Sequence, residues 1–255
     1  MRNRRGHGGG SAGFSLIEMM IVVGIIGLVL GGVFSQINAS MQRAATEQVK
    51  VDDFDEARDF VDQFFRDINQ IGYPNIRMVD TTSPLFVPPL VVPFANDARF
   101  ATGLVRIDNF ELRFEGDTNA DGIPETLIYK INGSGTCALC LQRSQINKVN
   151  GDPLNGQPAP NWGTEVNDAD LTNPIFTYYR TDGTQVLPAS LPLDTSTVGG
   201  QQTLASIKTI QINLRISNPN VLDPKTHQAI QTTYQGEVSL NNCSMAANGM
   251  PMSCQ

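Results

Sequence analysis

The chain has 255 residues, a charged fraction of 17% and a formal net charge of -7 at pH 7. This length allows one sizeable domain with an accessory segment, and the acidic balance disfavours nucleic acid as a partner, because phosphate binding needs a basic surface. Only two histidines occur, His7 and His227, which excludes a histidine cluster for a metal or a proton relay. No catalytic motif is present, so no enzymatic activity is expected.

The N-terminus combines a basic leader with a long apolar run. Residues 1–13 contain three arginines, and residues 14–34, FSLIEMMIVVGIIGLVLGGVF, contain a single charge at Glu18. About 20 apolar residues are enough for a helix to cross a hydrocarbon core, so residues 14–34 predict a membrane span. Because only Arg43 follows the span closely, the positive charge favours a cytoplasmic N-terminus and an exported C-terminal part.

Residues 13–18 read GFSLIE, and in this position, after a short basic leader and at the start of an apolar helix, they resemble the class III signal of type IV pilins. The resemblance implies that a prepilin peptidase cleaves after Gly13 and that the new N-terminal Phe14 is methylated. It also implies that Glu18 pairs with an N-terminal amine during subunit assembly, which agrees with the need of a carboxylate among apolar helices for a charged partner. The alternative for Glu18 is a side chain that reaches the lipid headgroups.

Apolar residues recur at steps of three and four after the span, from Val51 to Ile71, which indicates an amphipathic helix. Residues 72–74, GYP, end the pattern, because glycine suits a helix C-terminus and proline disfavours helix in the residue before it. One long helix is therefore predicted over residues 14–72. The stretch DFVDQFFRDINQIGYPN at its end resembles the helix ending of the PilW group of minor pilins.

The remainder, residues 73–255, is predicted to be an exported β-rich domain. Alternating apolar and polar residues indicate strands at 104–114, 126–131, 138–144, 175–180, 207–216 and 234–240. A long helix followed by strands with short turns favours an antiparallel sheet that covers the apolar face of the helix. The expected fold class is α+β with a pilin-like arrangement.

A loop between two of these strands has the spacing of a calcium-binding loop. Residues 117–125, DTNADGIPE, place oxygen-bearing side chains at loop positions one, three, five and nine and glycine at position six. Position twelve, which is glutamate in a complete EF-hand loop, is Ile128, so a calcium site here is expected to be incomplete and weak, with a dissociation constant of ~10⁻⁴ to 10⁻³ M. The same residue types favour a plain hairpin turn, which is the alternative. The candidate ligands are Asp117, Asn119, Asp121, Ile123 and Glu125.

Four cysteines lie downstream of the apolar helix, at Cys137, Cys140, Cys243 and Cys254. An even number in an exported domain favours two disulfides. Cys137 and Cys140 have no second CxxC pair or histidine to complete a zinc site, so a local disulfide that staples a hairpin is preferred. Cys243 and Cys254 would close a C-terminal loop. Four cysteines allow three connectivities, and pairing between sequence neighbours is favoured.

The leader, the apolar helix and the β-rich domain together resemble a minor pilin that takes part in type IV pilus assembly as an initiation or tip subunit. The resemblance implies other pilin subunits and the prepilin peptidase as partners. It also implies a single span in the bacterial inner membrane with a periplasmic C-terminal domain, followed by a place in the pilus at the cell surface. Two alternatives stay open, a J-type pseudopilin of a type II secretion system and a membrane-anchored extracellular binding module. Calcium is the one cofactor that the sequence suggests.

Overall fold

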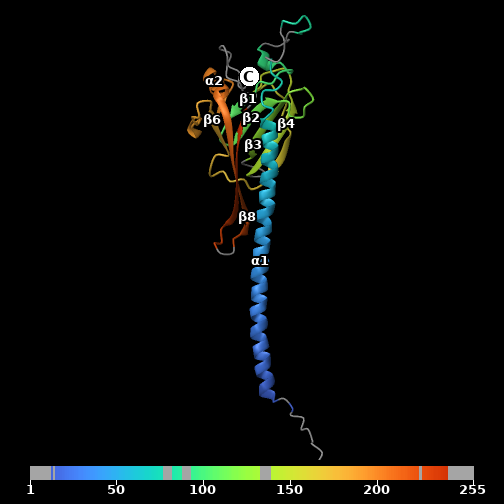
Figure 1. Ribbon diagram of the computed structural model, residues 1–255, viewed down its shortest axis with the longest axis vertical. Coiled ribbons are helices and arrows are strands. Elements are labelled where there is room, and N and C mark those ends of the chain that lie inside the picture. The colour runs from blue at the N-terminus through green and yellow to red at the C-terminus, as the bar shows by residue number, and fades with distance from the viewer. Residues whose placement is uncertain are drawn as a thin grey trace, which may run out of the picture. The chain divides into compact units, whose positions relative to one another are not determined.

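A computed structural model of the chain describes residues 13, 15–76, 82–87, 93–132, 139–223 and 226–240 (Figure 1). The chain divides into two compact units, a first unit of Met1–Gln48 and a second unit of Val49–Gln255. Helix α1 (Leu16–Ile68) begins in the first unit and ends in the second. The strands that the structure describes all lie in the second unit.

Helix α1 has 53 residues and changes character along its length. Every described residue from 15 to 45 is exposed, including large apolar side chains such as Leu28. From Val49 onward the helix instead buries one face, which consists of Ala57, Phe60, Val61, Phe64 and Ile68. Residues three and four apart lie on the same side of an α-helix, so the predicted amphipathic pattern is confirmed in this part of α1.

Within the described residues, the second unit contains two sheets whose paired strands are all antiparallel. The larger sheet has the order β5-β4-β3-β2-β1-β7, with β1 Leu104–Ile107, β2 Glu111–Gly116, β3 Glu125–Asn132, β4 Cys140–Asn147, β5 Trp162–Val166 and β7 Leu193–Asp194. The smaller sheet has the order β6-β8-β9, with β6 Phe176–Arg180, β8 Ile207–Leu222 and β9 Ala229–Ser239. The connections include helix α2 (Val198–Ser206) and the 3₁₀ helices η2 (Phe94–Asn96) and η3 (Pro188–Ser190).

The second half of α1 packs against both sheets. The Phe64 ring lies 5.3 Å from the Tyr129 ring of β3 in a T-shaped contact and 5.7 Å from the Phe176 ring of β6 in a stacked one. Phe60 makes a further T-shaped contact with Tyr129 at 5.7 Å, and all four rings are buried. The predicted α+β class, a long N-terminal helix packed on antiparallel sheet, is therefore confirmed, with two sheets in place of one.

A buried carboxylate fastens the end of α1 to the larger sheet. Asp67 Oδ2 accepts a hydrogen bond from the Tyr129 hydroxyl at 2.5 Å and from Arg143 Nε at 2.7 Å. Burial raises the pKa of the Tyr129 phenol well above its usual value, and the negative charge of Asp67 raises it further. After Ile68 the chain turns away through Gly72, whose φ of 76° is a left-handed conformation that glycine adopts without a steric penalty.

The strand boundaries show where the sequence pattern misleads. The prediction of a single strand at 104–114 is wrong, because the chain reverses at Asp108, whose amide donates to the Glu111 oxygen at 2.8 Å, and forms the β1–β2 hairpin. The turn residues Asp108 and Asn109 interrupt the alternation of apolar and polar residues by only one position, and the alternation resumes at Phe110, so the turn is easily missed. The other predicted strands each overlap one observed strand. The pattern does not predict β5, β7 or α2, since β5 is mostly exposed, β7 is very short and α2 contains two glycines.

The substitution Phe64→Ala is expected to lower the free energy of unfolding by about 3–5 kcal/mol, because it removes a fully buried ring that contacts both sheets. Thermal or urea unfolding of the detergent-solubilised full chain measures the loss. Phe54→Ala is the matched control on the same helix, since the Phe54 side chain is 43% exposed and should be worth much less. Equal losses for the two variants would contradict the placement of Phe64.

Candidate functional site

The predicted cleavage and assembly motif lies at the start of α1, in the first unit. Gly13 is exposed, and Glu18 occupies the first helical turn, where its amide donates to the Ser15 oxygen at 3.0 Å. Phe14 lies outside the described residues, as do residues 1–12. A carboxylate is favoured in a first turn, because the unpaired amides there carry partial positive charge. The exposed Glu18 side chain has no ion-pair partner among the residues that the structure describes.

Helix α1 is long and apolar enough to cross a membrane. None of its most apolar stretch is buried, whereas the apolar helix of a soluble core would be mostly covered by other elements. Gly27 and Gly31 form a small-xxx-small pair within this stretch, and a Cβ at either position would meet no atom within 4 Å. The stretch is thus open to lipid or to partner helices, which approach closely where small residues line the surface.

The predicted calcium loop, residues 117–125, connects β2 to β3 in the second unit. The Asp117 carboxylate accepts hydrogen bonds from the amides of Asp121 and Gly122 at 3.1 and 2.8 Å. The Asn119 oxygen accepts from the Asp121 amide at 2.9 Å, and the Asn119 side-chain amide donates to the Asp121 carboxylate at 3.0 Å. The loop therefore folds around its own polar side chains, which suits both of the predicted roles, a calcium site and a plain turn.

Three of the five candidate ligands form one cluster. One oxygen from each of Asp117, Asp121 and Glu125 lies within 4.8 Å of the other two. Asn119 is tied to this cluster through its hydrogen bonds with Asp121. Ile123 has an apolar, exposed side chain and an amide that donates to the Asp121 carboxylate at 2.8 Å, so its main-chain oxygen is the only ligand atom it offers.

Glu125 is fully buried at the end of the loop. Its Oε2 accepts from the amide and the hydroxyl of Thr118 at 2.8 and 3.1 Å, but its Oε1 is buried without a hydrogen-bond partner in the described part of the chain. Burial raises the pKa of the Glu125 carboxyl above its usual value; the hydrogen bonds from Thr118 oppose this shift, and the negative charges of Asp117 and Asp121 add to it. The hydrogen bonds within the loop therefore leave Glu125 Oε1 without a partner.

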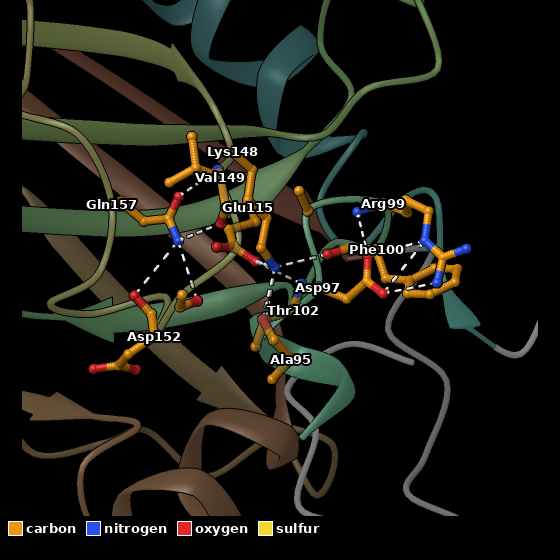
Figure 2. Close-up of polar contacts among 12 residues, drawn as sticks. Ala95, Asp97, Arg99, Phe100, Thr102, Glu115, Lys148, Val149, Asp152 and Gln157 are labelled. Carbon is orange, nitrogen blue, oxygen red and sulfur yellow. Dashed lines mark hydrogen bonds and ion pairs between the residues drawn. The ribbon is translucent and has the colours of Figure 1, made fainter. Parts of the chain in front are cut away.

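A buried ion pair lies next to the base of the loop (Figure 2). Lys148 Nζ lies 2.6 Å from Glu115 Oε2, and neither side chain is exposed. The ammonium also donates to the main-chain oxygens of Ala95 and Phe100 at 2.8 and 2.7 Å, so its three donors are engaged. Glu115 Oε2 accepts in addition from the Thr102 amide at 2.8 Å. The sequence does not distinguish this lysine and glutamate from exposed charged residues, because their burial depends on distant segments.

The ion pair and the loop share main chain. The Lys148 amide donates to the Pro124 oxygen at 2.8 Å, which holds the end of the loop. Glu115 is followed directly by Gly116, whose pairing with Glu125 closes the β2–β3 hairpin. The two residues of the ion pair therefore lie next to the two ends of the loop along the main chain.

The base of the loop also contacts the chain that leaves α1. The Gly72 amide donates to the Glu115 oxygen at 2.9 Å, and the Asp117 amide donates to the Tyr73 oxygen at 2.8 Å. Gly116 approaches this segment so closely that a Cβ would lie 2.3 Å from the Gln70 oxygen. The hairpin and the end of α1 are thus joined through main-chain contacts that need glycine at this position.

Cys140, at the start of β4, is buried and disulfide-bonded. Its strand neighbour in the larger sheet is Asn132 of β3. Cys137, Cys243 and Cys254 lie outside the described residues, so the connectivity of the four cysteines stays a prediction.

Comparison with known families gives one result, and it falls on the N-terminal motif. The family described as prokaryotic N-terminal methylation motif matches residues 9–34, which include Gly13, Glu18 and the apolar start of α1. The comparisons with curated proteins and with solved structures each gave no significant match. The motif supports a type IV pilin-like protein, either a pilin or a pseudopilin, that is anchored in a membrane and has a structural role.

The substitution Lys148→Met is expected to lower the free energy of unfolding by about 3–5 kcal/mol, because it leaves the Glu115 charge buried without its partner. Lys130→Met is the matched control, since Lys130 is 52% exposed and its 3.7 Å pair with Glu111 should contribute at most about 1 kcal/mol. Denaturant unfolding of the full chain in detergent measures both losses. If Lys148→Met lowered the free energy of unfolding no more than the control, the ion pair would not stabilise the fold.

Proposed function

We propose that the chain is a minor pilin that takes part in type IV pilus assembly after cleavage behind Gly13 and methylation of Phe14. The observation that carries this proposal is an exposed apolar helix that has Glu18 in its first turn and begins inside a match to the methylation motif. The PilW-like helix ending supports the minor-pilin class. The large exported part, residues 73–255, supports a place at the initiation complex or the tip, since a compact major subunit is usually smaller.

The apolar half of α1 needs partners in both stages of this process. Large apolar side chains exposed over residues 16–34 are unfavourable in water, because each such side chain loses about 1.5–3 kcal/mol of transfer free energy relative to burial. The inner membrane covers them before assembly, and the helices of other pilin subunits cover them in the fibre. Gly27 and Gly31 favour the second state, since small residues allow close helix packing.

Glu18 makes the assembly dependent on processing. A carboxylate within an apolar environment is strongly disfavoured unless it gains a charged partner. The ammonium at the N-terminus of a neighbouring Phe14 is such a partner, and it exists only after the prepilin peptidase has removed residues 1–13. Subunits that keep the leader therefore lack the group that Glu18 would bind, and they stay in the inner membrane with the C-terminal domain in the periplasm.

A J-type pseudopilin of a type II secretion system is the second candidate, because the same motif and helix serve both machines. A membrane-anchored binding module is the third. In that case α1 is only a tether, and Glu18 has no role beyond the membrane.

The substitution Glu18→Gln is expected to reduce the amount of this subunit in sheared fibres by more than about tenfold, because it removes the charge that pairs with the neighbouring amine. Asp55→Asn is the matched control, since it neutralises an exposed carboxylate of the same helix outside the predicted span. Mass spectrometry should find methylated Phe14 at the N-terminus of both variants. Any other mature N-terminus would contradict cleavage behind Gly13 and methylation of Phe14. Normal incorporation of Glu18→Gln into fibres would contradict the pairing of Glu18 with a neighbouring amine and favour the membrane-anchored binding module.

Deletion of the gene separates the pilus from the secretion machine. The minor-pilin proposal expects few or no surface pili by electron microscopy, together with normal levels of secreted proteins in the medium. Blocked secretion with normal pili would instead identify a pseudopilin. Re-expression of the wild-type chain is the control for polar effects on neighbouring genes.

A further inference from the structure

We infer that the loop of residues 117–125 binds a calcium ion through side-chain oxygens of Asp117, Asn119, Asp121 and Glu125 and the main-chain oxygen of Ile123. This site lies in the second unit, whereas the proposed assembly motif lies in the first. The inference therefore stands whether the chain is a pilin, a pseudopilin or a tethered module.

The spacing of the acidic oxygens fits a single calcium ion. Calcium is held at 2.3–2.6 Å by its oxygen ligands, so two ligands of one ion lie at most about 5 Å apart. The oxygens of Asp117, Asp121 and Glu125 lie within 4.8 Å of one another, which satisfies this limit without movement of the main chain. Asn119 is already hydrogen-bonded to Asp121 and completes the side-chain set.

The unpartnered oxygen of Glu125, which lies beside two further carboxylates, favours a metal site over a plain turn. Hydrogen bonds to loop amides account for Asp117, Asn119 and Asp121 as turn residues. They do not account for Glu125 Oε1, which is buried without a donor among the described residues, although buried polar atoms are nearly always bonded. A cation bound by the Glu125 carboxylate would supply a partner for this side chain.

The protein provides no positive charge for this cluster within its described part. None of the three carboxylates forms an ion pair with a lysine or an arginine there. Lys148 is near the base of the loop, but its ammonium is fully engaged by Glu115, Ala95 and Phe100 (Figure 2). Three carboxylates held together without a counter-charge repel one another, and a divalent ion removes this repulsion.

The ligand chemistry selects calcium among the divalent ions. All of the ligand atoms are oxygens, which hard cations prefer. Magnesium demands a near-ideal octahedron at shorter distances and gives up its water reluctantly, whereas calcium accepts irregular loops. Ile128, at the position of the twelfth EF-hand ligand, is buried in β3, and its side chain has no oxygen to offer as a ligand. The site is therefore weak, in the range of ~10⁻⁴ to 10⁻³ M that is typical of extracellular modules.

Binding would act on the end of α1 as well as on the hairpin. The Asp117 amide donates to the Tyr73 oxygen, and the Glu115 main-chain oxygen accepts from the Gly72 amide. Both Asp117, the first residue of the loop, and Glu115 therefore contact the segment that follows α1. An ion that fixes the loop therefore stabilises this junction, and thermal unfolding of the second unit should respond to calcium.

The test uses the full chain in detergent, freed of metal with EDTA and then titrated with CaCl₂ in a calorimeter. One calcium per chain is expected to bind with a dissociation constant of ~10⁻⁴ to 10⁻³ M, and 10 mM CaCl₂ should raise the melting temperature by roughly 3 to 10 °C. No saturable binding, or an equal response to MgCl₂, would overturn the inference.

Asp121→Ala should weaken calcium binding at least about tenfold and remove the melting response, because it deletes an exposed ligand without disturbing the core. Asp182→Ala is the matched control, since Asp182 is another exposed turn aspartate that accepts from Thr184 and precedes a glycine with positive φ. A second variant, Glu125→Gln, should also lose the response. If Asp121→Ala kept the full calcium response, calcium would bind elsewhere, and the loop of residues 117–125 would be a plain turn.

Discussion

The packing of the second half of α1 on two sheets is the contact on which the rest of the second unit depends. Phe64 contacts β3 and β6, which belong to different sheets, so this ring gives the sheets a common core. Apolar burial of this kind supplies most of the stability but little orientation. Asp67 adds the orientation, because its bonds to Tyr129 and Arg143 fix which face of the helix meets the larger sheet.

The same helix serves two purposes with two kinds of surface. From Val49 onward one apolar face, which includes Phe60, Phe64 and Ile68, is buried against strands of its own chain, whereas the apolar residues over 16–34 are covered by nothing that the structure describes. The first set stabilises the fold, and the second set is available to lipid and to other chains. One uninterrupted helix thus runs from a segment with exposed apolar side chains into the packed second unit.

Patterns set by local chemistry are readable from the sequence, and those set by distant contacts are not. The amphipathic stripe of α1 and the alternation in β8 agree with the residues that are buried, and three residues of the predicted loop, Asp117, Asp121 and Glu125, lie close together. The β1–β2 turn is missed because Asp108 and Asn109 interrupt the alternation by only one position. The Lys148–Glu115 pair spans 33 positions and the Tyr129–Asp67 bond spans 62, so no local pattern marks them. The unpartnered Glu125 oxygen depends likewise on burial by neighbouring strands.

Gly116 has a consequence for how this chain can vary. Its missing side chain lets β2 pass against the main chain at Gln70, a contact with no space for even a methyl group. Random mutation can therefore exchange many surface residues of the hairpin, but at this position any side chain must push the helix end and the sheet apart. In a library of functional variants we expect Gly116 to be among the least tolerant positions of β2, although it is neither charged nor part of any motif.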